Sequence, residues 1–100
     1  MKRYRVRFTP EARDDLERLY AFLLEQDAEA ADRAREAIAT ALELLAFTPY
    51  TCRKAMRGNP WLRELVIPFG RRGYVALVEI DDVRTVTIIA VRHQRESDLR

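Results

Sequence analysis

The spacing of apolar residues changes twice along the chain and sets the expected order of its secondary structure. Between residues 2 and 8, apolar and cationic side chains alternate, which predicts a half-buried strand with a cationic outer face. From about residue 10 to residue 48 the spacing is helical, and beyond residue 61 short β-branched and apolar runs return. The order strand, helix, helix, strand, strand, strand predicts an α+β fold with the helices packed on one face of the sheet.

Two helix-start signals divide the helical region. Thr9 followed by Pro10 is typical of a helix N-terminus, because threonine caps well and proline fits the first helical position. Asp27 offers a second cap, and the stripe of small and aliphatic residues after it ends at Thr48-Pro49. Small side chains let two helices approach closely. We therefore predict an antiparallel helical hairpin whose first helix ends just before Asp27.

The rest of the chain predicts a three-stranded antiparallel meander. Short turns rich in glycine or aspartate separate the strand-like segments, and such turns join neighbouring antiparallel strands. The predicted segments are a basic loop at 49–61, strands at 62–69, 74–80 and 84–92, turns at 70–73 and 81–82, and a polar tail from residue 93 that frays or makes a short helical turn. The length of 100 residues predicts one domain over residues 1–100.

Composition excludes several classes of protein. A chain with 48% hydrophobic and 34% charged residues is typical of globular proteins, and no apolar run is long enough to span a membrane. The single Cys52 and the lack of a signal-peptide core predict a cytoplasmic protein with no membrane partner. One histidine and one cysteine do not make an ordinary zinc site, and no glycine-rich phosphate loop is present. No metal and no cofactor are therefore expected.

Short motifs, in the predicted order of elements, resemble those of the RelE/ParE toxin family. Each motif is weak by itself, and the resemblance depends on their order and spacing over nearly the whole chain. The matching pieces are Phe8–Ala12 with Asp15-Leu16, Leu45 with Pro49, Leu62–Leu65, Tyr74, and Val91–Glu96. The resemblance implies a small toxin of a type II toxin–antitoxin pair, neutralised by a cognate antitoxin that is encoded beside it. It also implies that operator DNA is contacted only through the antitoxin.

The family contains two kinds of activity, and the resemblance implies one of them. RelE-like members cleave messenger RNA on the ribosome, whereas ParE-like members resemble them in fold but poison DNA gyrase. Cleavage would require a base, an acid and cationic groups at the phosphate. The candidates for these roles are Lys54, Arg63, His93 and Arg95.

The end of the last predicted strand departs from the nuclease pattern. RelE-like nucleases typically have an arginine directly after the histidine and a tyrosine a few residues later. Here Gln94 follows His93, and Ser97-Asp98 stands where the tyrosine is expected. An amide carries no charge to stabilise a phosphorane, and an aspartate repels phosphate. This departure favours a ParE-like gyrase inhibitor over an mRNA endoribonuclease, with a non-toxic family member as a third reading.

Two sets of contact residues follow from the ParE-like reading. For the target we predict cationic and aromatic groups near the end of the meander, namely Arg63, Tyr74, Arg92, His93 and Arg95. For the antitoxin we predict Leu19 and Leu23 on the first helix, with Arg3, Arg5 and Arg7 on the first strand. The first ten residues carry four cations and no acid, whereas residues 11–48 carry ten acids against four arginines. This contrast predicts a basic face opposite an acidic one, and the arginines suit an acidic peptide.

A purely structural role is also possible for three of the predicted target residues. His93 can be a strand-end imidazole that is hydrogen-bonded to backbone, and Arg63 next to Glu64 can form a cross-strand ion pair. Tyr74 can be a packing residue whose hydroxyl reaches the surface.

Overall fold

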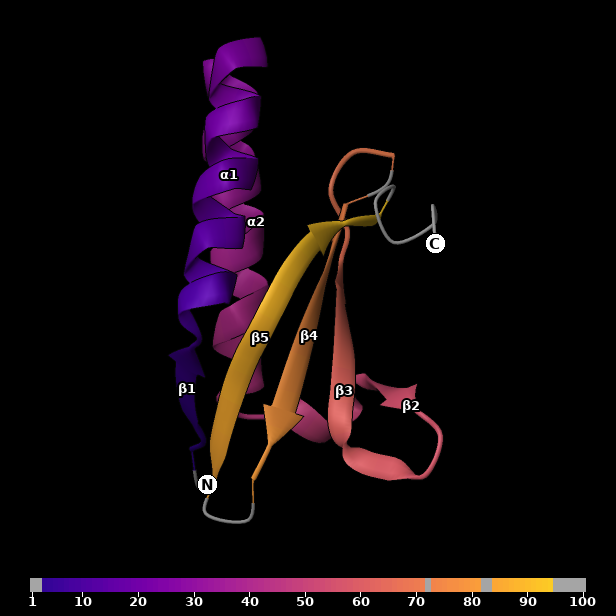
Figure 1. The fold of residues 1–100 in the computed structure, drawn as a ribbon. Helices are drawn as coiled ribbons and strands as arrows, with labels where there is room; N and C mark the ends of the chain where they lie inside the picture. The colour runs from indigo at the N-terminus through magenta and orange to yellow at the C-terminus, as the bar shows by residue number, and fades with distance from the viewer. Residues whose placement is uncertain (1–2, 72, 82–83, 95–100) are drawn as a thin grey trace.

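A computed structural model of the chain describes residues 3–71, 73–81 and 84–94 (Figure 1). Its helices and strands follow one another in the predicted order, with one additional strand between the helices and the meander. They are β1 (Arg5–Phe8), α1 (Pro10–Gln26), α2 (Ala28–Leu45), the 3-10 turn η1 (Pro49–Thr51), β2 (Arg53–Met56), β3 (Asn59–Ile67), β4 (Tyr74–Ile80) and β5 (Thr85–His93). No helix of the described ranges is both long and apolar enough to cross a membrane.

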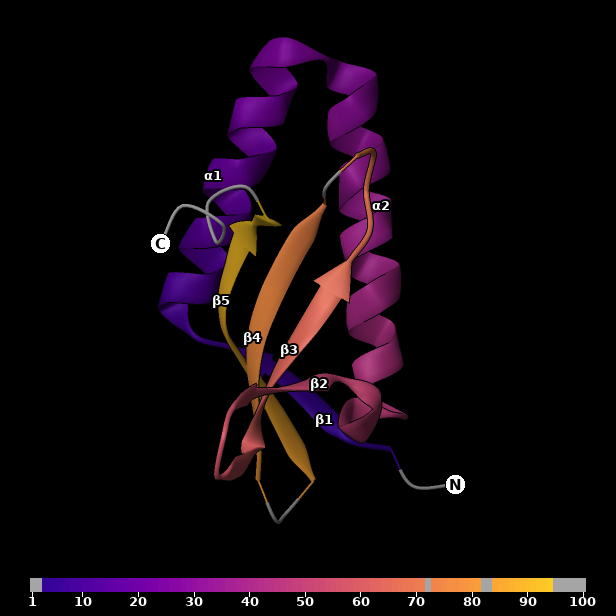
Figure 2. The same ribbon diagram turned by 90° about the vertical axis from the view of Figure 1, so that its right-hand side faces the viewer.

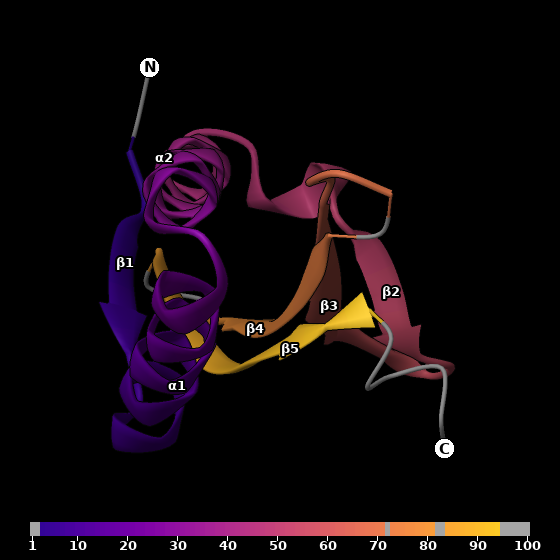
Figure 3. The ribbon, with the colours of Figure 1, turned by 90° about the horizontal axis from the view of Figure 1, so that it is seen from above.

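The described strands form one five-stranded sheet in the order β1-β5-β4-β3-β2. β1 pairs with β5 in parallel, and every other neighbouring pair is antiparallel. Figure 2 shows the hairpin of α1 and α2 behind the sheet, and Figure 3 shows both helices gathered with β1 at one side and β2 at the opposite edge. The α+β class and the packing of the helices on one face are confirmed.

Both predicted helix caps are present. The hydroxyl oxygen of Thr9 accepts a hydrogen bond from the amide of Ala12 at 3.0 Å, and Pro10 is the first residue of α1. The Asp27 carboxylate accepts from the amides of Glu29 and Ala30 at 3.0 and 3.2 Å, which starts α2 immediately after α1 ends. Because one residue separates the helices, the chain must reverse there, and a hairpin is the result.

The N-terminal part of α1 covers the edge of β5 beyond the point where β1 ends. The Thr9 hydroxyl donates to the carbonyl of Ile89 at 2.9 Å, and the Asp15 carboxylate accepts from the amide of Val91 at 2.9 Å. These two side chains satisfy backbone groups of β5 that have no strand neighbour on that side. The start of α1 therefore protects the part of the β5 edge that β1 does not cover.

Replacing Asp15 with alanine should lower the free energy of unfolding by about 1–3 kcal/mol, because the Val91 amide loses its acceptor in a partly buried position. Urea unfolding followed by circular dichroism measures the change. Asp14→Ala is the matched control, since Asp14 is the exposed neighbour on the same helix. Equal losses in the two variants would show that helix charge, and not the hydrogen bond to β5, is responsible.

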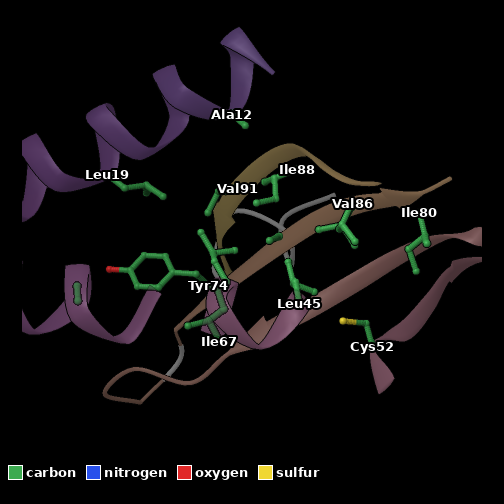
Figure 4. Packing of buried hydrophobic residues seen from close by; sticks show 14 residues of the cluster. Ala12, Leu19, Leu45, Cys52, Ile67, Tyr74, Ile80, Val86, Ile88 and Val91 are labelled. Carbon is green, nitrogen blue, oxygen red and sulfur yellow. The ribbon is translucent and has the colours of Figure 1, made fainter. Parts of the chain in front are cut away.

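The core lies between the sheet and the two helices (Figure 4). Alternate residues of the central strands β4 and β5 point into it, because side chains of a strand alternate between its faces. The helices contribute small residues such as Ala12 and Ala34, which bring their backbones close to each other and to the sheet. The largest fully buried side chains include Leu45, Ile67, Val78, Ile80, Val86, Ile88 and Val91.

The segment 49–61 differs from its prediction as an irregular loop. It contains η1, β2 and the start of β3, which begins at Asn59 and not at residue 62. β2 is a four-residue edge strand whose register with β3 shifts between Lys54 and Met56. Short, charged edge strands show little alternation of apolar residues, and proline within a run argues against a strand. Pro60 is tolerated because it lies in the irregular first part of β3.

Candidate functional site

An open groove runs between the outer edge of β1 and the side of α2. Its volume is about 1140 Å³. Its lining combines apolar side chains with the arginines of the first strand and of the turn before β5. The lining residues are Arg3, Tyr4, Arg5, Val6, Phe8, Ala39, Leu42, Glu43, Ala46, Arg84 and Thr85. β1 is the last strand of the described sheet, so one of its edges faces this groove without a strand neighbour.

A second, more apolar cleft of about 380 Å³ lies between α1 and α2. Leucine, isoleucine and alanine side chains form most of its walls, and Tyr74 of β4 reaches it from the sheet. At its mouth the Tyr20 hydroxyl lies 3.4 Å from the Asp32 carboxylate, and the Arg35 guanidinium lies over the Tyr20 ring at 5.4 Å. The two helices are therefore also linked by polar contacts across the cleft.

The two depressions lie next to each other. They adjoin each other on α2, because Ala39 and Leu42 line both the groove beside β1 and the interhelical cleft. The combined surface carries arginines at its β1 end and mainly apolar side chains at its interhelical end. We call it the α2 groove, meaning the residues that line either depression. Its lining combines partly buried apolar side chains with charged ones, a combination that suits an amphipathic chain segment.

Arginines dominate the charge at the β1 end of the α2 groove. Arg3, Arg5 and Arg84 line it together with a single acid, Glu43. Arg84 adopts a left-handed backbone conformation with φ of 66°, and its carbonyl accepts a hydrogen bond from the amide of Arg5 at 2.7 Å. This contact ties the turn before β5 to β1 and keeps the three arginines near one another. Their positive potential favours an anionic partner.

Four of the five residues predicted to meet an antitoxin lie on the α2 groove. Arg3 and Arg5 line the β1 end, and Leu19 and Leu23 line the interhelical cleft. Arg7 is exposed but does not line either depression. Sequence reasoning missed the contributions of α2 and Arg84. Exposed small residues in a helix, as at Ala39, were the only available signal, because a wide groove requires that no long side chain fills it.

Arg63 of β3 serves to hold the adjacent loop. Its guanidinium donates to the carbonyls of Pro60 at 2.7 Å and Cys52 at 3.0 Å, and it lies over the Tyr50 ring at 5.1 Å. The predicted ion pair of Glu64 is made instead by Arg53, whose Nε donates to the carboxylate at 2.9 Å. Arg63 thus stabilises the return of the chain from η1 into β2.

Tyr74 and His93 pack against each other at the end of the sheet. Tyr74 is only 2% exposed, and the ring of His93 meets it edge-on at 5.6 Å. Burial raises the pKa of the Tyr74 hydroxyl, so this group stays neutral at physiological pH. Tyr74 packs in the core cluster, as its packing interpretation predicted, and the little surface that it keeps lies on the interhelical cleft and not at the exposed end of the meander.

Of the described residues suggested for RNA cleavage, Lys54 and Arg63 lie together and His93 lies apart from them. Lys54 lies opposite Arg63 on the neighbouring strand, whereas His93 pairs with Tyr74, two strands from β3. By register, Arg63 and His93 are separated by roughly 13 Å along the strands and roughly 10 Å across them. Arg92, the neighbour of His93, faces the opposite side of the sheet. Arg95, Ser97 and Asp98 lie outside the described residues.

Cys52 is buried next to this loop. Burial raises the pKa of its thiol, and the positive charge of Arg63 opposes this increase only in part. The side chain is 8% exposed, so Cys52 packs as a small apolar residue and not as a reactive thiolate.

Comparison with known proteins assigns the family. The family model of the ParE toxin of the type II toxin–antitoxin system parDE matches residues 6–98. Toxin RelE3 of Caulobacter vibrioides is 35% identical over 91 residues, which are 91% of this chain and 95% of that protein.

Two solved structures have the same fold. The chromosomal ParDE system from P. aeruginosa has a TM-score of 0.71 at 18% identity, and the alignment covers 90% of this chain and 95% of the other. The RelBE2 toxin–antitoxin complex from Mycobacterium tuberculosis has a TM-score of 0.57 at 29% identity, with 91% and 98% covered. These likenesses show the fold, and the sequence matches establish that the chain belongs to the RelE/ParE superfamily of type II toxin–antitoxin toxins.

Proposed function

We propose that this toxin acts by binding and inhibiting DNA gyrase, and that a cognate antitoxin neutralises it by occupying the α2 groove. The gyrase proposal is supported mainly by the distance between the residues that were suggested for RNA cleavage. The family match is to a model named for ParE, which agrees with it.

Transesterification at an RNA phosphate needs an acid, a base and a cation within hydrogen-bond reach of one reacting group. In the described residues, Arg63 donates its hydrogen bonds to backbone carbonyls, and His93 is more than ten ångströms away by register, at about 16 Å. Breaking the Arg63 contacts to reach a phosphate would leave carbonyl groups of the loop without their donor. These observations favour a toxin that inhibits its target by binding over one that cleaves RNA with Arg63 and His93.

A second candidate is a ribosome-dependent mRNA endoribonuclease. It is favoured by the likeness to proteins named RelE3 and RelBE2, and by the position of Lys54 directly opposite Arg63. It would require Arg63 to leave its backbone partners when RNA binds. It also predicts that Arg63→Ala, or Arg95→Ala, removes cleavage without unfolding the protein.

For the gyrase contact we assign the exposed end of the meander. Arg92 is exposed and projects from β5 on the face opposite the helices, and His93 follows it at the strand end. Arg95 belongs to the same predicted set. Tyr74 and Arg63 are not part of this contact, because the first is buried and the second is held in the loop.

The charge and shape of the α2 groove support the antitoxin assignment. An acidic chain segment would meet Arg3, Arg5 and Arg84, and an extended segment could pair with the open edge of β1. Apolar side chains of the same partner would fill the interhelical cleft. A partner of this chemistry would cover most of the apolar surface that the groove exposes.

Purified toxin should be assayed in parallel on gyrase supercoiling of a relaxed plasmid and on messenger RNA bound to ribosomes. We expect loss of supercoiling with intact messenger. Cleaved messenger with normal supercoiling would overturn the gyrase proposal and favour the second candidate. In that case Arg63→Ala, checked by circular dichroism for its fold, would test the cleavage residues. If neither substrate is affected, both activities are excluded, and a non-toxic family member is the better description.

A further inference from the structure

Tyr74 of β4 is the one residue of the sheet among those that line the interhelical cleft, and the other polar residues of that lining, Glu17, Tyr20 and Arg35, belong to the helices. Its ring packs against Phe69, with centroids 6.0 Å apart, and against His93. Figure 4 shows its oxygen directed away from the other labelled sheet residues, toward the side where α1 carries Leu19. The same residue lines the interhelical cleft together with Leu16, Leu19, Leu23, Ala34 and Ile38.

The Tyr74 hydroxyl makes no hydrogen bond within the described ranges of the chain. The described residues also contain no fully buried side-chain nitrogen or oxygen that lacks a partner. Since Tyr74 is 2% exposed, the accessible part of its hydroxyl must open into the cleft that it lines. The group is neutral, and a phenol can donate one hydrogen bond and accept another. With no partner among the described residues, the hydroxyl can form a hydrogen bond with a group that enters the cleft.

The occupant that fits this site is a peptide segment of a partner protein. The cleft adjoins the arginine-lined groove at Ala39 and Leu42, so an extended occupant that crosses these two residues would contact both. The lining of α2 extends from Ala31 to Ala46, which corresponds to roughly 22 Å of helix. A small ligand would fill only the apolar end, whereas a peptide matches both the length and the change from apolar walls to arginines.

We propose that the Tyr74 hydroxyl is a specificity contact for the antitoxin, selecting a segment that presents one hydrogen-bonding group among the apolar side chains that fill the interhelical cleft. This inference rests on the proposed neutralisation at the α2 groove and adds the chemistry of the recognised segment. A partner that carries only hydrocarbon at this point would cover the hydroxyl and leave it without a hydrogen bond, which weakens binding by about tenfold or more. The recognised segment therefore has an apolar part with one polar atom, followed by an acidic part toward β1.

Tyr74→Phe tests the proposal, because it removes only the hydroxyl and keeps the ring that packs on Phe69 and His93. The probe is the purified protein encoded beside the toxin gene, titrated against the full toxin by isothermal calorimetry. We expect the variant to bind about tenfold or more weakly, while its thermal unfolding temperature does not fall, because the hydroxyl has no hydrogen-bond partner among the described residues to lose. Tyr50→Phe is the matched control, since it removes a phenol hydroxyl outside the α2 groove and should leave the affinity unchanged.

The outcomes separate this inference from the proposed function. If Tyr74→Phe binds as tightly as the wild type while Ala39→Trp, which obstructs the middle of the groove, does not bind, the groove assignment stands and the role of Tyr74 is overturned. Loss of affinity in Tyr50→Phe as large as in Tyr74→Phe would also overturn it. If the wild-type toxin does not bind the neighbouring protein, the antitoxin assignment itself fails, and the inference fails with it.

Discussion

Replacing Gly73 with alanine is expected to lower the free energy of unfolding by on the order of 4 kcal/mol or more, a large part of the total stability of a typical domain. Gly73 has φ of 97°, a conformation that residues with a side chain rarely adopt. A Cβ atom there would overlap the carbonyl oxygen of Ile67 and lie 2.7 Å from the amide nitrogen of Phe69. Both neighbours are backbone atoms, so no side-chain movement can relieve the contact.

The effect of Gly73→Ala is measured by urea unfolding, and Gly70→Ala provides the control. Gly70 belongs to the same turn and also has positive φ, at 61°, but nothing lies within 4 Å of the position that its Cβ would take. Gly70→Ala should therefore lose only about 1 kcal/mol, from backbone strain alone. Similar losses in the two variants would show that the close approach at Gly73 has little energetic weight.

Introducing tryptophan at Ala39 is expected to weaken antitoxin binding by about 100-fold or more, which corresponds to about 2.7 kcal/mol. Ala39 is exposed on α2 and lines both depressions of the α2 groove, so a large side chain there would obstruct it at its midpoint. The position is at the surface, and the substitution does not disturb the core. Thermal unfolding should confirm that the variant folds before its affinity is measured.

Thr40→Trp is the matched control for the Ala39 variant. Thr40 is the next residue of α2 and is exposed, but it does not line the groove. Because successive residues of a helix point about 100° apart, the same side chain is presented away from the groove. Unchanged affinity is expected for Thr40→Trp. Equal weakening by both substitutions would indicate that the antitoxin contacts another face of α2, and no weakening by either would remove the groove from the binding site.

Much of the fold could be predicted because the local signals agree with the tertiary structure. The caps at Thr9 and Asp27 place both helices, and alternation in β1 identifies Val6 and Phe8 as its partly buried side chains. β4 begins and ends where its pattern predicts. In contrast, β2 is stabilised by pairing with β3 and by the contacts of Arg63 with the loop, which are non-local. Its own four residues carry too little apolar pattern to identify it.

The candidate site could be predicted only in part, and for a physical reason. Arginines in the first strand and leucines in the first helix are visible as residue types, and four of those five positions line the α2 groove. A groove, however, is space between elements, and it depends on the distance of β1 from α2 and on the small side chain of Ala39. The position of Tyr74 on the interhelical cleft could not be predicted for the same reason, since the start of β4 is covered by helices that lie far from it in sequence.

The parallel pairing of β1 with β5 has a consequence for synthesis. Arg5 has Thr85 as its partner, and the Thr9 hydroxyl reaches the carbonyl of Ile89, 80 residues later. Closing so long a loop is entropically costly and is typical of slow steps in folding. During translation the first strand leaves the ribosome long before its only strand neighbour exists. The β1 end of the α2 groove, which includes Arg84 and Thr85, therefore forms only after β5 has been made. An antitoxin that recognises this end would bind only a chain in which β5 has already been made.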